Sequence, residues 1–213
     1  MSIANNLNVV LSSLTKEVTL VAVSKTILNS SLLEAYHAGQ KVFGENKVQE
    51  LVQKAKDLPK DIIWHMIGHL QTNKVKLIAP FVSLIHGVDS IKLLKEINKR
   101  AEQNNRVIDC LLQVHIATEK TKFGFDITEV EQAITIAKEF PNIKIVGLMG
   151  MATFTDNKQQ VIQEFNSLKI LFETVKNKDI TILSMGMSAD YQLAIDKGST
   201  MVRVGSAIFE HRN

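Results

Sequence analysis

The sequence of 213 residues predicts an α/β protein, a single-domain (β/α)8 TIM barrel with an extra N-terminal helix. Short runs rich in β-branched residues alternate about eight times with longer segments of helical periodicity. Strands separated by helices run parallel, because each crossover helix returns the chain to the same end of the sheet. An open doubly wound sheet also fits this pattern. Eight repeats without a reversal favour the closed barrel, although the chain is short for that fold.

Each element follows from its own pattern, in chain order. An amphipathic segment at 3–14 is expected to form the extra helix. Continuous apolar, β-branched runs predict strands at 18–23, 41–43, 62–67, 81–86, 107–114, 143–149, 181–184 and 201–204. Apolar residues at intervals of three and four predict helices at 31–38, 47–56, 72–79, 91–104, 128–140, 159–175 and 189–197.

The composition excludes several classes of protein. Apolar residues make up 45% and charged residues 22% of the chain, which is typical of a globular domain and not of a disordered one. The net charge of +3 is too small to indicate nucleic-acid binding. The single cysteine, Cys110, indicates a reducing compartment. No signal peptide or membrane-spanning run is found, so we expect one soluble, cytoplasmic domain over residues 1–213.

Lys25 is the first candidate for chemistry, because it follows the apolar run at 18–23. Active sites of barrels lie at the carboxyl ends of the strands. Partial desolvation there disfavours the ammonium form, and a neutral amine can form a Schiff base with an aldehyde. The alternative is a lysine that extends into solvent as its strand ends, and spacing alone favours that alternative.

Two further segments are typical of an anion site. Ser188 follows the seventh expected strand and suits a helix N-cap, and Gly205 and Ser206 follow the eighth. The loops after the last two strands of barrels often hold a phosphate. Arg203 lies inside an apolar strand, where its guanidinium needs a partner. An ordinary cap and a structural salt bridge are the alternatives.

Seven stretches, taken together and in order, resemble the pyridoxal phosphate homeostasis protein family, whose fold is similar to the N-terminal barrel of bacterial alanine racemase. They are VAVSKT at 21–26, FGENKVQE at 43–50, WHMIGHLQTNK at 64–74, TKFGF at 121–125, GLM at 147–149, LSMGMSAD at 183–190 and VRVGS at 202–206. The sequence departs from the family pattern at Glu210, where a glycine is common, and at Lys120. Neither position belongs to the expected phosphate site.

The resemblance implies pyridoxal 5′-phosphate as the cofactor, held on Lys25 as a Schiff base. Ser188, Gly205 and Ser206 would bind its phosphate, and Arg203 would face the pyridine nitrogen. The family match further implies three contacts to the ring or its phenolic oxygen, from Asn46, Met151 and Lys122. The residues alone favour a different role for Asn46, as the cap of the following helix.

Two classes of function remain open at this point. The first is a monomeric protein that holds the cofactor reversibly, buffers its concentration and passes it to apo-enzymes. The second is a racemase or lyase for a small amino acid. Racemisation needs a base on each face of the bound amino acid, and we expect the two tyrosines, Tyr36 and Tyr191, on outer helices. We assign no catalytic residue, and no metal site, because His65 and His69 fall on and after a strand.

Overall fold

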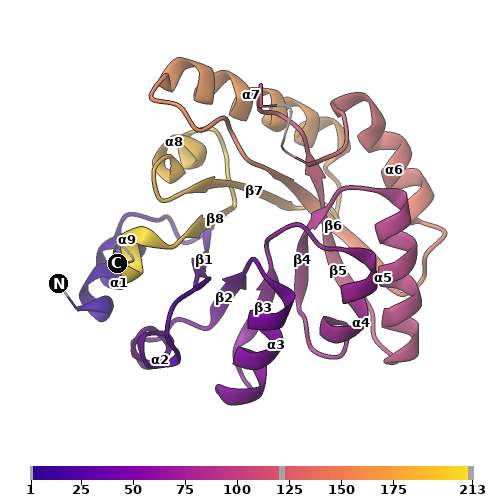
Figure 1. The fold of residues 1–213 in the computed structure, drawn as a ribbon. Coiled ribbons are helices and arrows are strands. Elements are labelled where there is room, and N and C mark those ends of the chain that lie inside the picture. The colour runs from indigo at the N-terminus through magenta and orange to yellow at the C-terminus, as the bar shows by residue number, and fades with distance from the viewer. Residues whose placement is uncertain (1, 120–122, 211–213) are drawn as a thin grey trace.

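The computed structural model describes residues 2–119 and 123–210. Across these two ranges eight parallel strands close into a barrel, in the order β1-β2-β3-β4-β5-β6-β7-β8, as Figure 1 shows. The predicted (β/α)8 fold is therefore confirmed. The strands are β1 (Thr19–Val23), β2 (Val42–Glu45), β3 (Ile63–Met66), β4 (Leu84–Val88), β5 (Ile108–Val114), β6 (Ile143–Gly150), β7 (Ile182–Met187) and β8 (Met201–Val204).

Helices cover the outside of the barrel. They are α1 (Ile3–Ser12), α2 (Asn29–His37), α3 (Val48–Asp57), α4 (Val75–Ile78), α5 (Ile91–Gln103), α6 (Val130–Ala137), α7 (Lys158–Val175), α8 (Tyr191–Asp196) and α9 (Ser206–Phe209), with 3-10 turns η1 (Thr72–Lys74) and η2 (Ile127–Glu129). The expected N-terminal helix is α1, which lies beside α9 in Figure 1. The Asn6 amide donates to the Ile208 carbonyl at 3.1 Å, so the two ends of the described chain are joined.

Several boundaries differ from the prediction. The fourth strand begins at Leu84 and not at residue 81, because the amides of Phe81 and Val82 still donate to Ile78 and continue the turn of α4. The seventh strand continues to Met187 through a shift of register, which Gly186 allows with a φ of 96°. The short helix α9 is not predicted, because four residues carry no periodic pattern.

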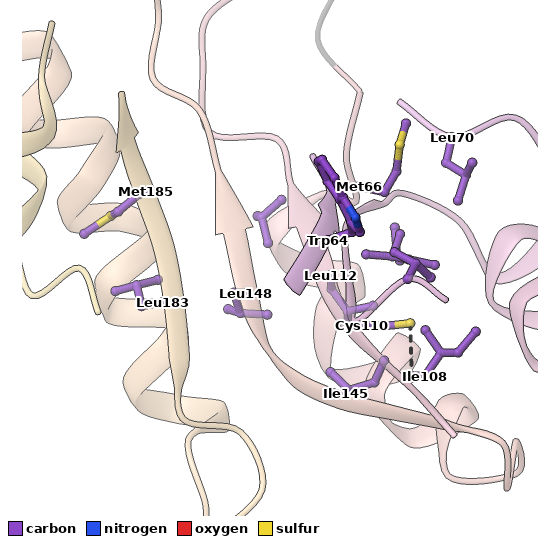
Figure 2. Packing of buried hydrophobic residues seen from close by; sticks show 14 of the residues in the cluster. Trp64, Met66, Leu70, Ile108, Cys110, Leu112, Ile145, Leu148, Leu183 and Met185 are labelled. Carbon is purple, nitrogen blue, oxygen red and sulfur yellow. Dashed lines mark hydrogen bonds between the residues drawn. The ribbon is translucent and has the colours of Figure 1, made fainter. Parts of the chain in front are cut away.

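The apolar core has two layers. The outer layer lies between the strands and the helices, and Figure 2 shows part of it around Trp64, Met66, Leu112 and Leu148. The inner layer fills the lower barrel with Val21, Ile67, Leu84, Leu111, Val146, Met149 and Met201. These side chains fill the interior of the barrel below the carboxyl ends of its strands. In the described residues, no helix is long and apolar enough to cross a membrane.

Candidate functional site

A cavity of about 920 Å³ opens at the carboxyl ends of the strands. The predicted site residues within the described ranges all line it, although they lie on or after five different strands, β1, β2, β6, β7 and β8: Lys25, Asn46, Met151, Ser188, Arg203, Gly205 and Ser206. Lys122 lies outside the described residues. The structure therefore brings the predicted residues together in one place.

Lys25 reaches the cavity because of the alternation of side chains along β1. Val21 belongs to the inner layer of the barrel, and Val23 packs against that layer. Side chains two residues apart point to the same face of a strand, so Lys25, just past the end of β1, continues the inward row. Val23 and Lys25 both line the cavity. The lysine therefore faces the cavity and not the helical layer.

Arg203 lies inside the barrel, where register places it beside Val21. It is 3% exposed, and it donates to Ser184 Oγ at 2.6 Å and to the Gly150 carbonyl at 3.1 Å. Burial lowers the pKa of Arg203 to about 10, and the Asp190 carboxylate opposes that shift. The guanidinium is therefore still charged at neutral pH and presents only donors to the cavity.

A chain of hydrogen bonds leads from Arg203 into the barrel. Because Arg203 can only donate, Ser184 Oγ accepts from it and is left to donate to His86 Nδ1, 3.3 Å away. His86 then carries its proton on Nε2, which lies 3.1 Å from His65 Nδ1. Burial lowers the pKa of His65 to about 4, and burial together with His65 and Arg203 holds that of His86 well below its ordinary value. Both rings are therefore neutral and orient Arg203 through Ser184.

The sequence does not predict these hydrogen bonds, because His65 and His86 lie on different strands and no spacing links them. The register of the sheet provides the missing information. Leu84, in the inner layer, pairs with His65, and His86 follows Leu84 by two residues on the same strand. Both imidazoles must therefore point into the barrel.

Ser188 does not cap a helix, so that part of the prediction is wrong. The N-cap of α8 is Asp190, whose Oδ1 accepts from the Met187 amide at 2.6 Å. Ser188 Oγ instead accepts from the Gly205 amide at 3.0 Å and ties the β7 loop to the β8 loop. A Cβ at Gly205 would lie 3.0 Å from the Val23 carbonyl, so only glycine fits here without a shift. Ser188, Gly205 and Ser206 thus form one polar wall of the cavity.

Asn46, after β2, also lines the cavity. The alternative role as a helix cap is wrong, because α3 begins after Lys47. The Asn46 backbone lies close to Gly68. A Cβ added at Gly68 would lie 2.4 Å from the Asn46 carbonyl oxygen. The loops after β2 and β3 therefore depend on a glycine at this contact.

An aromatic rim completes the site. The His69 ring stacks on Phe123 with their centroids 3.9 Å apart, and His69 Nδ1 lies 2.9 Å from Asp89 Oδ2. Gln113, inside the barrel, donates to the Phe123 carbonyl at 2.7 Å. His69, Phe123 and Gln113 all line the cavity. The position of His69 after a strand was a signal in the sequence, whereas its stacking partner comes from a distant loop.

The geometry defines a class of protein, a (β/α)8 barrel with a small-molecule cavity lined by an amine, a buried cation and two serine- and glycine-containing loops. The chain belongs to the family of the alanine racemase N-terminal domain, which matches residues 1–213, and within it to the pyridoxal phosphate homeostasis proteins. The resemblance to this family that the sequence suggested is thus confirmed.

Two relatives of that name illustrate the similarity. The pyridoxal phosphate homeostasis protein of Aquifex aeolicus (strain VF5) is 41% identical over 199 residues, which cover 91% of this chain and 86% of the relative. The protein of the same name from Escherichia coli (strain K12) is 34% identical over 204 residues, which cover 93% and 87%.

Solved structures agree with this placement. PipY of Synechococcus elongatus PCC7942, solved without PLP, superposes with a TM-score of 0.91 at 34% identity and covers 97% of this chain and 99% of its own. The same protein with PLP bound gives 0.88 at 32% identity, with the same two coverages. An alanine racemase of Clostridium difficile 630 has a TM-score of 0.81 at 15% identity, and this chain covers 57% of it. That last likeness shows a shared fold.

Proposed function

We propose that this protein binds pyridoxal 5′-phosphate and takes part in the homeostasis of that cofactor inside the cell. One observation carries the proposal: Lys25, Arg203 and the Ser188–Gly205 pair, which are far apart in sequence, line a single cavity of about 920 Å³. The names of the relatives, and the bound PLP of PipY, support the same ligand.

The residues of the cavity fit the chemistry of this cofactor. Pyridoxal phosphate supplies an aldehyde that condenses with amines, attached to an aromatic ring that can accept electrons. The Lys25 amine would hold the aldehyde carbon, and Arg203 would donate to the pyridine nitrogen. The hydroxyls and amides of Ser188, Gly205 and Ser206 would hold the phosphate. Asn46 would contact the ring on its phenolic side.

Arg203 argues for storage of the cofactor over turnover of amino acids. A guanidinium that stays charged can donate to an unprotonated ring nitrogen but cannot accept a hydrogen bond from a protonated one. The ring nitrogen therefore stays unprotonated, and the ring remains a weak electron sink. Hydrogen bonds to Ser184 Oγ and the Gly150 carbonyl hold the guanidinium in this position. A protein built in this way retains the cofactor without strongly activating it.

The two tyrosines support the same reading. The Tyr36 hydroxyl donates to Asp61 at 2.7 Å, and the Tyr191 hydroxyl lies 3.1 Å from Ser13 Oγ. Both hydroxyls are thus engaged on the outside of the barrel. A racemase or lyase needs a second base facing Lys25 across the ligand, and neither tyrosine is placed for that role.

We further propose that the protein is a cytoplasmic monomer that hands the cofactor to apo-enzymes. Reversible covalent capture by an amine suits this role, because a free amine on another protein can take the aldehyde in exchange.

An absorbance titration of the purified protein with pyridoxal phosphate tests the proposal. Wild-type protein should develop the visible band of a lysine-bound cofactor, and borohydride should fix the adduct to the peptide that carries Lys25. Lys25→Ala should abolish both signals. Lys158→Ala is the matched control, because Lys158 also lines the cavity and should be dispensable.

Two results would contradict the proposal. Retention of the trapped adduct in Lys25→Ala would mean that another lysine holds the cofactor. Fast racemisation or elimination of any common amino acid by the loaded protein would replace the homeostasis function with an enzymatic one.

A further inference from the structure

Lys25 occupies a strained turn. The Ile27 amide donates to the Ser24 carbonyl at 3.0 Å and closes a four-residue turn with Lys25 and Thr26 in the middle. Thr26, the third residue, has a φ of 62°, in the left-handed region. Turns of this kind normally place glycine at that position, and a β-branched residue there is a genuine outlier. Such strain persists only where surrounding contacts hold it.

Helix α3 provides those contacts through two side chains. The Thr26 amide donates to Glu50 Oε1 at 2.5 Å, and Lys54 Nζ donates to the Ser24 carbonyl at 2.6 Å. The Ser24 carbonyl belongs to the peptide group before Lys25, and the Thr26 amide belongs to the peptide group after it. Both peptide groups that flank the Lys25 Cα are therefore held from one helix.

Buried charges fix these two side chains in turn. Lys54 is 5% exposed, and its three N–H groups reach the Ser24 carbonyl, Glu45 Oε1 at 2.8 Å and Glu50 Oε1 at 2.7 Å. The Ser24 hydroxyl also donates to Glu45 Oε1, at 2.6 Å. Among the described residues, Glu45 Oε2 is buried with no hydrogen-bond partner.

A buried charge cluster of this kind contributes little to the free energy of folding. Buried ion pairs lose much of their attraction to desolvation, and apolar residues of similar size often do as well. An orphaned carboxylate oxygen adds a further cost. The cluster contacts the peptide groups on both sides of Lys25. This location suggests a second role, which is to fix the conformation of the turn at Lys25.

We propose that Glu50 and Lys54 are positioning residues, which hold the strained turn so that the Lys25 amine enters the cavity in a fixed direction. This inference rests on the proposed function, in which that amine captures the cofactor aldehyde. An amine on a relaxed turn spends less time at the reacting position, so capture becomes weaker although every group that contacts the cofactor is still present.

Two variants of Glu50 separate positioning from charge. Glu50→Gln keeps an oxygen that can accept from the Thr26 amide, whereas Glu50→Ala removes it. Gln53→Ala is the matched control, since Gln53 is exposed on the same helix and pairs with Asp57. We expect Glu50→Ala to raise the dissociation constant of pyridoxal phosphate about tenfold, with Glu50→Gln and Gln53→Ala within about twofold of wild type.

Amide hydrogen exchange of the cofactor-free proteins provides a second readout. The peptide that spans residues 24–27 should lose protection in Glu50→Ala and keep it in Glu50→Gln and Gln53→Ala. Lost protection with an unchanged dissociation constant would overturn the positioning role, and so would equal weakening by the alanine and glutamine variants.

Failure of the proposed function gives a different pattern. In that case wild type and Gln53→Ala would not bind the cofactor, or Lys25→Ala would bind it as well as wild type. Either result overturns both proposals and is seen before any Glu50 variant is compared. If Glu50→Ala does not fold, the double variant Thr26→Gly/Glu50→Ala tests the same turn, because glycine adopts the positive φ without strain. The double variant should bind pyridoxal phosphate within about twofold of Thr26→Gly, and a tenfold loss would overturn the positioning role.

Discussion

Acid should destabilise this protein through the two histidines inside its barrel. His65 is 5% exposed and His86 is fully buried. Desolvation lowers the pKa of His65 from 6.5 to about 4, and that of His86 well below 6.5 with further contributions from His65 and Arg203. Below about pH 6.5 the unfolded chain therefore binds two protons, one on each histidine, that the folded barrel does not bind. The stabilising contribution is complete above the unfolded pKa and is lost as the pH falls through 6.5 towards 4.

The size of the effect follows from the linkage between protons and folding. Between about pH 7.5 and about pH 5, His65 should lower the free energy of unfolding by about 2 kcal/mol, and His86 should lower it further in the same direction. Glu45 acts in the opposite direction. Burial raises its pKa, so the folded state binds that proton first and gains stability in acid.

A comparison of variants isolates the histidine contribution from that of Glu45. In His65→Asn the amide oxygen takes the place of Nδ1 and can still accept from His86. Urea unfolding across this pH range should then show a loss smaller than that of wild type by about 2 kcal/mol. His37→Asn, at an exposed histidine of α2, should follow the wild-type curve. Parallel curves for wild type and His65→Asn would refute the claim that His65 is held neutral in the barrel.

Three other substitutions probe the core and the cofactor contact. Phe165→Ala, at a fully buried residue of α7, should lower the free energy of unfolding by about 3–5 kcal/mol, measured by urea titration. Phe154→Ala, at a residue 92% exposed, should change it by less than about 0.5 kcal/mol, and equal losses would contradict the packing of α7. Arg203→Glu should let the ring nitrogen of bound pyridoxal phosphate share a proton and shift its visible band to longer wavelength, whereas an unchanged spectrum would exclude that contact.

The fold was predictable because its signal is repetitive. Eight apolar β-branched runs separated by helical segments leave few topologies, and a parallel barrel places every strand end at one mouth. Lys25, Arg203 and Gly205 could therefore be assigned to one site from their positions after or near the ends of strands. Boundaries were less predictable, because Met187 stays in its strand only through the positive φ of Gly186.

The features that the sequence could not provide depend on register and on contacts between distant elements. His65 and His86 form a pair because neighbouring strands align Leu84 with His65. Glu50 and Lys54 support the Lys25 turn because one face of α3 lies over the end of β1. A single sequence shows which residues lie on a helix, but not which carbonyl or amide of another loop they meet.

The barrel closes where β1 pairs with β8, with Val21 opposite Arg203. This pairing joins the first and last strands of the barrel, and it brings Lys25 into the same cavity as Ser188 and Gly205. The amine therefore belongs to the first strand of the barrel, whereas the proposed phosphate wall belongs to the last two strands and is synthesised later. A chain truncated before residue 201 would keep Lys25 but lack Arg203, Gly205 and Ser206, so we expect it not to capture pyridoxal phosphate even if its first strands assemble.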